Sequence, residues 1–249
     1  MRRAGRSYAE KYVKIQREEF VRLGVLADWE KPYLTMDFSY EAAIARELGR
    51  FVEQGLVYKG IKPVLWCVHC KTALAEAEIE YEERESPSIY VRFPLDEDLG
   101  DVFPKLKGKK GSVVIWTTTP WTLPANLAVS LHPRFDYVAI PYKDEFLILA
   151  KNLVTPFTRE IGIEEPPALE RFSATKLERR SCRHPFLPRK SLLILSDHVT
   201  IDTGTGCVHT APGHGEEDFV VGQAYGLPPL NPVDDEGKFT PECGVKEWT

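Results

Sequence analysis

Apolar residues recur at helical spacing through the first 60 residues of the chain. Tyr8, Tyr12 and Ile15 fall on one face, and Gly24 is expected to end the helix that carries them. A second helix is expected at Ser39, whose hydroxyl can cap it. Its apolar stripe comprises Ile44, Leu48, Phe51 and Val52. The pattern therefore predicts two amphipathic helices in this part of the chain.

Beyond residue 88 the pattern changes to short apolar runs of strand length. These runs lie at residues 89–93, 113–116, 137–140, 146–149 and 191–195. Lys143, Asp144 and Glu145 separate two of them and predict a hairpin. Many short strands with few helices favour a sheet that closes on itself or nearly does so. We therefore predict an α/β protein in which a mostly helical flank, residues 1–80, precedes a strand-rich, β-barrel-like domain, residues 81–249.

Composition narrows the class of protein without identifying its chemistry. Of the 249 residues, 43% are hydrophobic and 28% are charged, as in ordinary globular proteins, and the net charge is -5. No apolar run is long enough to cross a bilayer, and no signal core follows the basic N-terminus. We therefore expect a location in the cytoplasm and no membrane partner. The five cysteines lack regular spacing, which fits reduced thiols better than a disulfide framework.

The acidic balance argues against binding nucleic acid through the whole surface, but it leaves room for a local basic path. Two basic groups stand out in the sequence. They comprise Lys105, Lys107, Lys109 and Lys110, and Arg179, Arg180, Arg183, Arg189 and Lys190. We expect each group to be a solvated loop rather than a phosphate track.

The strand predicted at residues 113–116 runs into a cluster of hydroxyl groups. The segment from Trp116 to Asn126 contains Thr117, Thr118, Thr119 and Thr122. Pro120 and Pro124 bias the residues before them toward extended backbone, which stiffens the segment. Such a strand end can bind a polar ligand through hydrogen bonds and hold a water. A threonine-rich strand and turn without a ligand is the alternative, since threonine favours strands.

A second stretch with candidate chemistry runs over residues 204–219. Cys207 ends a predicted strand, and a tight loop rich in glycine follows, where backbone can approach a ligand closely. A helix is expected over residues 216–225, with Asp218 in its acidic first turn. These acids can simply complement the helix dipole, or they can hold a metal together with His209 and His214. The spacing matches no familiar metal motif, so we expect no metal here.

Cys67 and Cys70 form a Cys-x-x-Cys pair, which is half of a zinc site. Cys182 and His184 are the candidates for the other half, but their Cys-x-His spacing is unusual. A redox pair is a further alternative, although no thioredoxin-like context surrounds it. We expect unmetallated thiols near a domain junction.

Neither stretch contains a recognisable covalent catalyst. Cys207 has no orienting acid nearby in the sequence, and no Gly-x-Ser-x-Gly sequence is present. A hydrolase built from these residues would position water against an ester that is already reactive, and orientation alone can contribute much to such a reaction.

Together, these stretches resemble the bacterial isoleucyl-tRNA synthetases, in the part that holds their inserted editing domain. The block from Thr117 to Asn126 resembles the threonine-rich editing motif, with Thr119 where valyl and leucyl relatives carry arginine. Residues 204–219 resemble the second editing motif, and residues 23–38 and 67–81 also read like this family. The resemblance covers nearly the whole chain.

The resemblance implies a role for each residue of the two motifs. Asp218 would hold the α-ammonium of a valine wrongly joined to tRNA(Ile), and His209 would border the side-chain pocket and exclude isoleucine. Residues of the first motif would contact the terminal adenosine or the ester, place the water and support the wall of the site. These are Trp116, Thr117, Thr118, Thr119, Thr122 and Asn126.

The resemblance also implies what the remainder of the synthetase supplies. The sequence lacks His-Ile-Gly-His and Lys-Met-Ser-Lys-Ser, which the family uses for ATP. ATP and Mg²⁺ would therefore serve only the parent ligase, and editing would need no cofactor. Residues 1 to about 75 would be the edge of a Rossmann-type synthetic domain. The partners would be the acceptor end of tRNA(Ile), its valine ester and the rest of the enzyme.

Two alternatives to an editing esterase stay open. A non-catalytic tRNA-binding or scaffold fragment would bind tRNA without turnover, with an affinity that falls steeply as salt rises. A metal-dependent hydrolase would lose its activity in chelator.

Overall fold

A computed structural model describes residues 2–249 of the chain. Its contacts divide the chain into two compact units, Met1–Gly60 and Ile61–Thr249, which are described separately here. The sequence predicted a functional boundary between residues 80 and 81, and that boundary stays a prediction. Residues 61–80 belong to the second unit by their contacts, because Trp66 and Lys71 are bonded to residues near position 235.

The first unit contains the two predicted helices, α1 (Arg2–Arg22) and α2 (Phe38–Glu53). The cap of α2 differs from the prediction, since Asp37 occupies the N-cap and Ser39 lies inside the helix. Neither helix buries a side chain, and the stripe of α2 at Ile44 and Leu48 is 57% exposed. Among residues 2–249, no helix combines the length and apolar character needed to cross a membrane.

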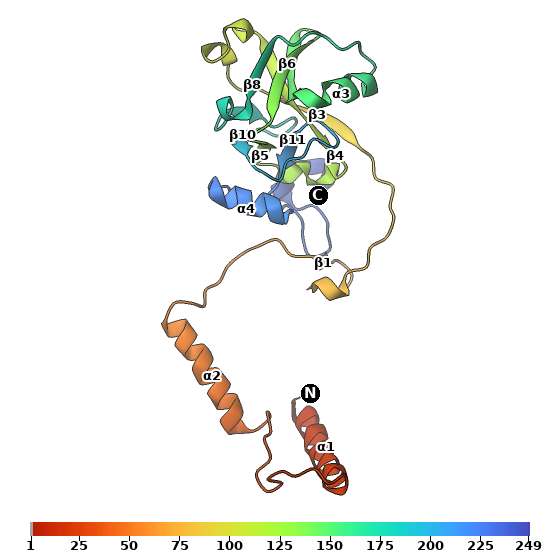
Figure 1. The fold of residues 1–249 in the computed structure, drawn as a ribbon, viewed down its shortest axis with the longest axis vertical. Coiled ribbons are helices and arrows are strands. Elements are labelled where there is room, and N and C mark those ends of the chain that lie inside the picture. Colours follow the sequence, from red (N-terminus) through yellow and green to blue (C-terminus); the bar gives the residue numbers. More distant parts are fainter. Residues whose placement is uncertain (1) are drawn as a thin grey trace. The chain divides into compact units, whose positions relative to one another are not determined.

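The second unit is built on two sheets (Figure 1). The five-stranded sheet has the order β3-β4-β7-β6-β8, and the four-stranded sheet has the order β11-β5-β10-β9. The strands of the first sheet are β3 (Ile89–Pro94), β4 (Lys110–Thr117), β7 (Glu145–Ala150), β6 (Asp136–Tyr142) and β8 (Glu170–Ser173). Those of the second are β11 (Cys207–Thr210), β5 (Ala128–Leu131), β10 (Lys190–Leu195) and β9 (Ser181–Arg183). A separate two-stranded ribbon pairs β1 (Trp66–Cys67) with β2 (Thr72–Ala73).

The sheets form no closed barrel within residues 2–249, although they meet along one side. A single bridge joins Leu95, just after β3, to Cys182 of β9, and the Asp96 N–H donates to the Ser181 carbonyl at 2.9 Å. The prediction of a strand-rich α/β fold is confirmed. The two sheets are joined at the Leu95–Cys182 bridge but do not close into a barrel within residues 2–249.

The main core lies between the two sheets, and one helix covers the outer face of each. Val113 and Ile115 of β4 face this core, whereas Val114 faces α3 (Val154–Glu160), as the alternation of a strand requires. The helix α4 (Glu216–Ala224) packs Val221 against Ala128 and Ile194 of the four-stranded sheet (Figure 1). This arrangement fixes the start of α4 near the ends of β5 and β11.

Candidate functional site

The threonine-rich segment is a preformed turn at the end of β4. Thr117 is buried, and its hydroxyl oxygen accepts the Thr119 N–H at 3.1 Å and lies 3.2 Å from the Thr119 hydroxyl. The carbonyl of Thr118 accepts a bond from the Ser86 hydroxyl at 2.6 Å. A 3-10 helix, Pro120–Ala125, follows, with its first proline where no N–H is needed. The side chains of Thr118 and Thr119 thus lie at least partly exposed on a fixed backbone.

A direct contact joins this turn to the second motif. Thr122 Oγ1 donates to the Thr119 carbonyl at 2.9 Å, and the same oxygen lies 2.9 Å from His209 Nε2. Because the single hydroxyl proton goes to the carbonyl, Nε2 of His209 carries the proton of that second bond. Nδ1 of His209 is then an acceptor, and it is buried without a partner among residues 2–249. Burial, aided by His214 and His184, lowers the pKa of His209 to about 4, so the ring is neutral near pH 7.

Asp218 is held at the end of the strand that carries His209. Its Oδ2 accepts the Ala211 N–H at 2.9 Å, and its Oδ1 lies 3.9 Å from His198 Nε2. Burial raises the pKa of Asp218, and the Ala211 N–H and His198 oppose that shift in part. A partly desolvated carboxylate of this kind is suited to an ammonium group, which restores the interaction lost with water.

Trp116 and Asn126 stand at the two ends of the threonine-rich segment. A Cβ added to Gly204, where φ is +78°, would lie 3.0 Å from the Trp116 side chain, so this glycine lets the second motif pack on the indole. The Asn126 amide is fully buried, donates to the Ala128 carbonyl at 2.8 Å and accepts from the Ser191 hydroxyl at 2.5 Å. Asn126 therefore supports the turn from within, and its contact with a substrate stays a prediction.

The turn rests on two residues that the sequence did not single out for this role. His184 Nε2 donates to the Leu123 carbonyl at 2.9 Å, while its Nδ1 accepts the Leu187 N–H at 3.1 Å. Arg189 Nη2 donates to the Pro124 carbonyl. The basic group around residue 189 was expected to be a solvated loop, and for two of its members this is wrong. Arg189 is partly buried and bonded to the turn, and Arg180 is paired with Glu97 and Asp101.

The five cysteines form no disulfide within residues 2–249, and their reduced state stays a prediction. The N–H groups of Cys70 and His69 lower the pKa of Cys67. Cys182 and His184 were the candidates for the second half of a zinc site. Cys182 is buried in the core, where desolvation raises its pKa to about 12, and the His184 ring is bonded to the Leu123 carbonyl. Within residues 2–249, no group of three or more His, Cys, Asp or Glu side chains is placed to hold a metal ion.

The family of tRNA synthetases class I (I, L, M and V) matches residues 1–225. This chain belongs to that family. The match covers both units and includes the threonine-rich turn, His209 and Asp218.

The chain is similar to several curated isoleucine–tRNA ligases. It is 56% identical over 243 residues to that of Desulfotalea psychrophila, and 56% identical over 239 residues to that of Syntrophotalea carbinolica. These alignments cover 98% and 96% of this chain but 26% of each relative. The chain thus spans about a quarter of the length of the curated relatives it matches.

Among solved structures, the chain is similar to GlLeuRS-CP1, with 17% identity, a TM-score of 0.47 and coverage of 57% of this chain and 66% of that one. It is also similar to the P. knowlesi cytosolic leucyl-tRNA synthetase editing domain, with 11% identity, a TM-score of 0.46 and the same coverage.

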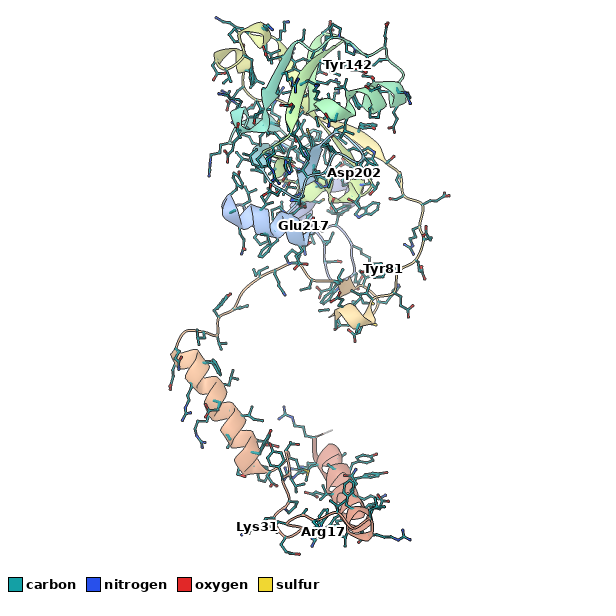
Figure 2. All side chains as sticks on the ribbon, viewed as in Figure 1. Arg17, Lys31, Tyr81, Tyr142, Asp202 and Glu217 are labelled. Atoms are coloured by element: carbon teal, nitrogen blue, oxygen red, sulfur yellow. The ribbon has the colours of Figure 1, made fainter. Side chains whose placement is uncertain are left out.

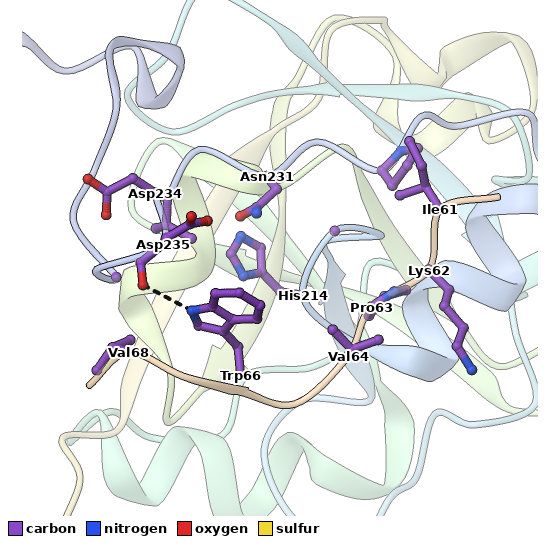
Figure 3. Close-up of a pocket in the computed structure, with 14 residues that line it drawn as sticks. Ile61, Lys62, Pro63, Val64, Trp66, Val68, His214, Asn231, Asp234 and Asp235 are labelled. Carbon is purple, nitrogen blue, oxygen red and sulfur yellow. Dashed lines mark hydrogen bonds between the residues drawn. The ribbon is translucent and has the colours of Figure 1, made fainter. Parts of the chain in front are cut away.

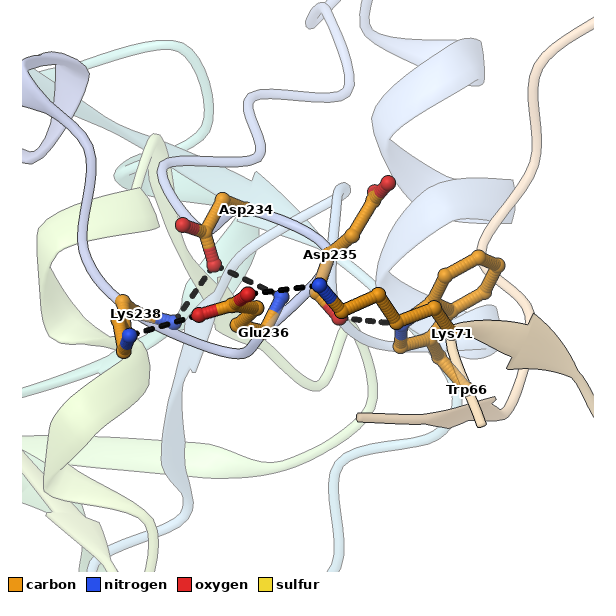
Figure 4. Close-up of polar contacts among 6 residues, drawn as sticks. All are labelled: Trp66, Lys71, Asp234, Asp235, Glu236 and Lys238. Atoms are coloured by element: carbon orange, nitrogen blue, oxygen red, sulfur yellow. Dashed lines mark hydrogen bonds and ion pairs between the residues drawn. The ribbon is translucent and has the colours of Figure 1, made fainter. Parts of the chain in front are cut away.

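A cavity of about 360 Å³ is lined in part by Gly213 and His214, the turn between His209 and Asp218 (Figure 3). Residues 61–68 and 229–237 supply the rest of its wall. The Trp66 indole N–H donates to the Asp235 carbonyl at 2.9 Å, and Lys71 Nζ lies 2.6 Å from the Glu236 carboxylate (Figure 4). These bonds hold the segment that carries the cysteine pair against the loop that follows α4.

The structure brings part of the first motif into contact with the second. Thr119, Thr122 and His209 form one chain of contacts. Asp218 is bonded to Ala211, which lies two residues after His209. Sequence reasoning missed His198, which faces Asp218, because nothing local distinguishes a histidine that follows a predicted strand.

Proposed function

We propose that this chain is the part of an isoleucine–tRNA ligase that hydrolyses Val-tRNA(Ile). Water would attack the carbonyl carbon of the ester, and the bond to the terminal ribose oxygen would break, releasing valine and tRNA(Ile). The contact between Thr122 and His209 carries the proposal, since it joins the hydroxyl-lined turn to the strand end where Asp218 lies. Cytoplasmic location, the tRNA partner and the rest of the ligase belong to the same proposal.

Each group would act on a different part of the substrate. Asp218 would bind the α-ammonium, and the exposed hydroxyls near Thr118 and Thr119 would orient the ester and the water. His209, held rigidly by Thr122, would limit the depth of the side-chain pocket. A pocket built for isoleucine rejects the smaller valine only modestly, and this pair is the standard example of that limit. A second pocket that is too small for isoleucine would admit only the valine ester, because overpacking is costly.

Deacylation of Val-tRNA(Ile) and Ile-tRNA(Ile) by the chain, with and without chelator, tests the proposal. We expect hydrolysis of the valine ester alone, unchanged by chelator. Binding without turnover would favour a tRNA-binding fragment, and loss of activity in chelator would favour a metal-dependent hydrolase.

Asp218→Asn should lower the rate of Val-tRNA(Ile) hydrolysis by about tenfold or more, because a neutral amide loses the charge-assisted bond to the ammonium. Glu216→Gln is the matched control, since Glu216 is exposed in the same first turn of α4. Equal rates in both variants would remove Asp218 from the mechanism.

His209→Ala should allow Ile-tRNA(Ile) to be hydrolysed, because the wall of the side-chain pocket recedes. The exposed His69→Ala should keep isoleucine excluded. Continued sparing of the isoleucine ester by His209→Ala would show that another residue sets the size of the pocket.

A further inference from the structure

A second cavity, of about 450 Å³, lies at the turn between β9 and β10. Its charged lining consists of three cations, Arg183, Arg189 and Lys190, and one carboxylate, Asp96. His184 also lines the cavity, and burial lowers its pKa to about 4, so it adds no charge near pH 7. The wall therefore carries an excess of positive charge in a chain whose net charge is -5.

Two of these cations oppose each other across the hairpin. Arg183 and Lys190 are directly paired in the antiparallel register of β9 and β10, so their side chains share one face. Lys190 Nζ is neutralised by Asp96 at 2.6 Å. Arg183 is exposed, and no ion pair joins it to another residue in the part of the chain that the structure describes. Arg183 therefore keeps a positive charge on this face that a bound anion can pair with.

The third cation connects the cavity to the threonine-rich turn. Arg189 donates through Nη2 to the Pro124 carbonyl, and its Nε is buried without a partner. Arg189 also lines the cavity, so its guanidinium charge would attract an anion bound there. Arg189 therefore borders both the cavity and the threonine-rich turn.

An aromatic surface adjoins the same cavity. The ring of Phe186 meets that of His184 at 4.6 Å and that of Trp248 at 5.9 Å. Phe186 is 46% exposed. Basic grooves beside exposed aromatic rings are the common way to bind single-stranded nucleic acid, because cations hold phosphates while bases stack on the rings.

We propose that the cavity between β9 and β10 binds a backbone phosphate of the unpaired acceptor end of a tRNA, and that a neighbouring base stacks on Phe186. The identity of the RNA rests on the proposed function, whereas the phosphate site rests on the cavity itself. The turn between β9 and β10 contains Pro185 and Pro188 and is held by the bonds of His184, so it would bind without reorganising.

Binding of unacylated tRNA(Ile) to the full chain, measured at several salt concentrations, tests the proposal. Arg183→Gln should weaken binding and should lower the slope of log affinity against log salt by about 1, as the loss of one phosphate contact does. Phe186→Leu should weaken binding by about tenfold and leave the slope unchanged. Arg159→Gln, which removes an exposed arginine of α3, should change neither quantity.

An unchanged slope in Arg183→Gln would overturn the phosphate site, and an unchanged affinity in Phe186→Leu would overturn the stacking. Unacylated tRNA needs no hydrolysis to bind, so this measurement is independent of deacylation. A chain that binds tRNA as described but never releases valine would refute the proposed function alone.

Discussion

At the scale of the residue, His209 is the side chain that joins the second motif to the first by a hydrogen bond. Its Nε2 proton is committed to Thr122, and its Nδ1 is left as a buried acceptor. The ring cannot rotate without breaking that bond, and burial, which lowers its pKa to about 4, keeps it neutral near pH 7. The same residue can therefore set a size limit that a free histidine could not.

Gly213 shows how tightly the second motif is packed. A Cβ at this position would lie 2.1 Å from the Leu230 carbonyl oxygen, and only backbone movement could relieve the clash. We expect Gly213→Ala to destabilise the second unit by about 1–3 kcal/mol, as overpacking does, and to lower deacylation because the turn leads to Asp218. Thermal unfolding measures the first effect.

The control for Gly213→Ala is Gly49→Ala, since a Cβ at Gly49 in α2 meets nothing within 4 Å. Alanine also favours a helix over glycine by about 0.5–1 kcal/mol, so this variant should be neutral or stabilising. An unfolding temperature for Gly213→Ala equal to that of the parent would mean that the backbone of residues 228–231 moves away from the new Cβ without loss of stability.

At the scale of the element, Tyr137 couples the two sheets. It lies in β6 of the five-stranded sheet, and its hydroxyl donates to the Gly206 carbonyl at 2.6 Å, just before β11. The same oxygen accepts the His132 N–H at 2.9 Å, just after β5. One fully buried hydroxyl thus ties the ends of two strands of the four-stranded sheet to a strand of the other.

Tyr137→Phe should lower the free energy of unfolding by about 1–3 kcal/mol, because two buried backbone groups lose their partner. Tyr142→Phe removes a hydroxyl near the other end of β6 (Figure 2) and should cost little. Denaturant titration of both variants compares them. Equal stabilities would show that water replaces the Tyr137 hydroxyl without cost.

At the scale of the whole molecule, two buried neutral histidines make stability depend on pH. Burial lowers the pKa values of His184 and His209 to about 4, from 6.5 in an exposed histidine. Between those values the unfolded chain binds more protons than the folded one, so the free energy of unfolding falls as pH falls. Each residue contributes up to about 1.4 kcal/mol per pH unit in this window.

We therefore expect urea unfolding at pH 7, 6 and 5 to show a progressive loss of stability. The double variant His184→Gln/His209→Gln should have a lower stability at pH 7 and a weaker dependence on pH. His69→Gln, at an exposed position, should leave the dependence as it is in the parent. A slope in the double variant as steep as in the parent would assign the acid sensitivity to other groups.

Local patterns were enough to predict several elements. The stripes of α1 and α2, the hairpin of β6 and β7 and the helix α4 were all found, because periodicity and turn residues are properties of neighbouring positions. The strands β5, β8 and β9 and the helix α3 were missed. The missed strands have three or four residues, too short for a period to show.

The sequence by itself determined the two motifs, their order and the family, since these depend only on which residues follow one another. Only the tertiary structure decided that β5 lies between β10 and β11, that Thr122 meets His209, and that Arg189 donates to the Pro124 carbonyl. The two side-chain contacts join residues 65 and 87 positions apart. Their partners are chosen by how the sheets pack, and no local pattern carries that information.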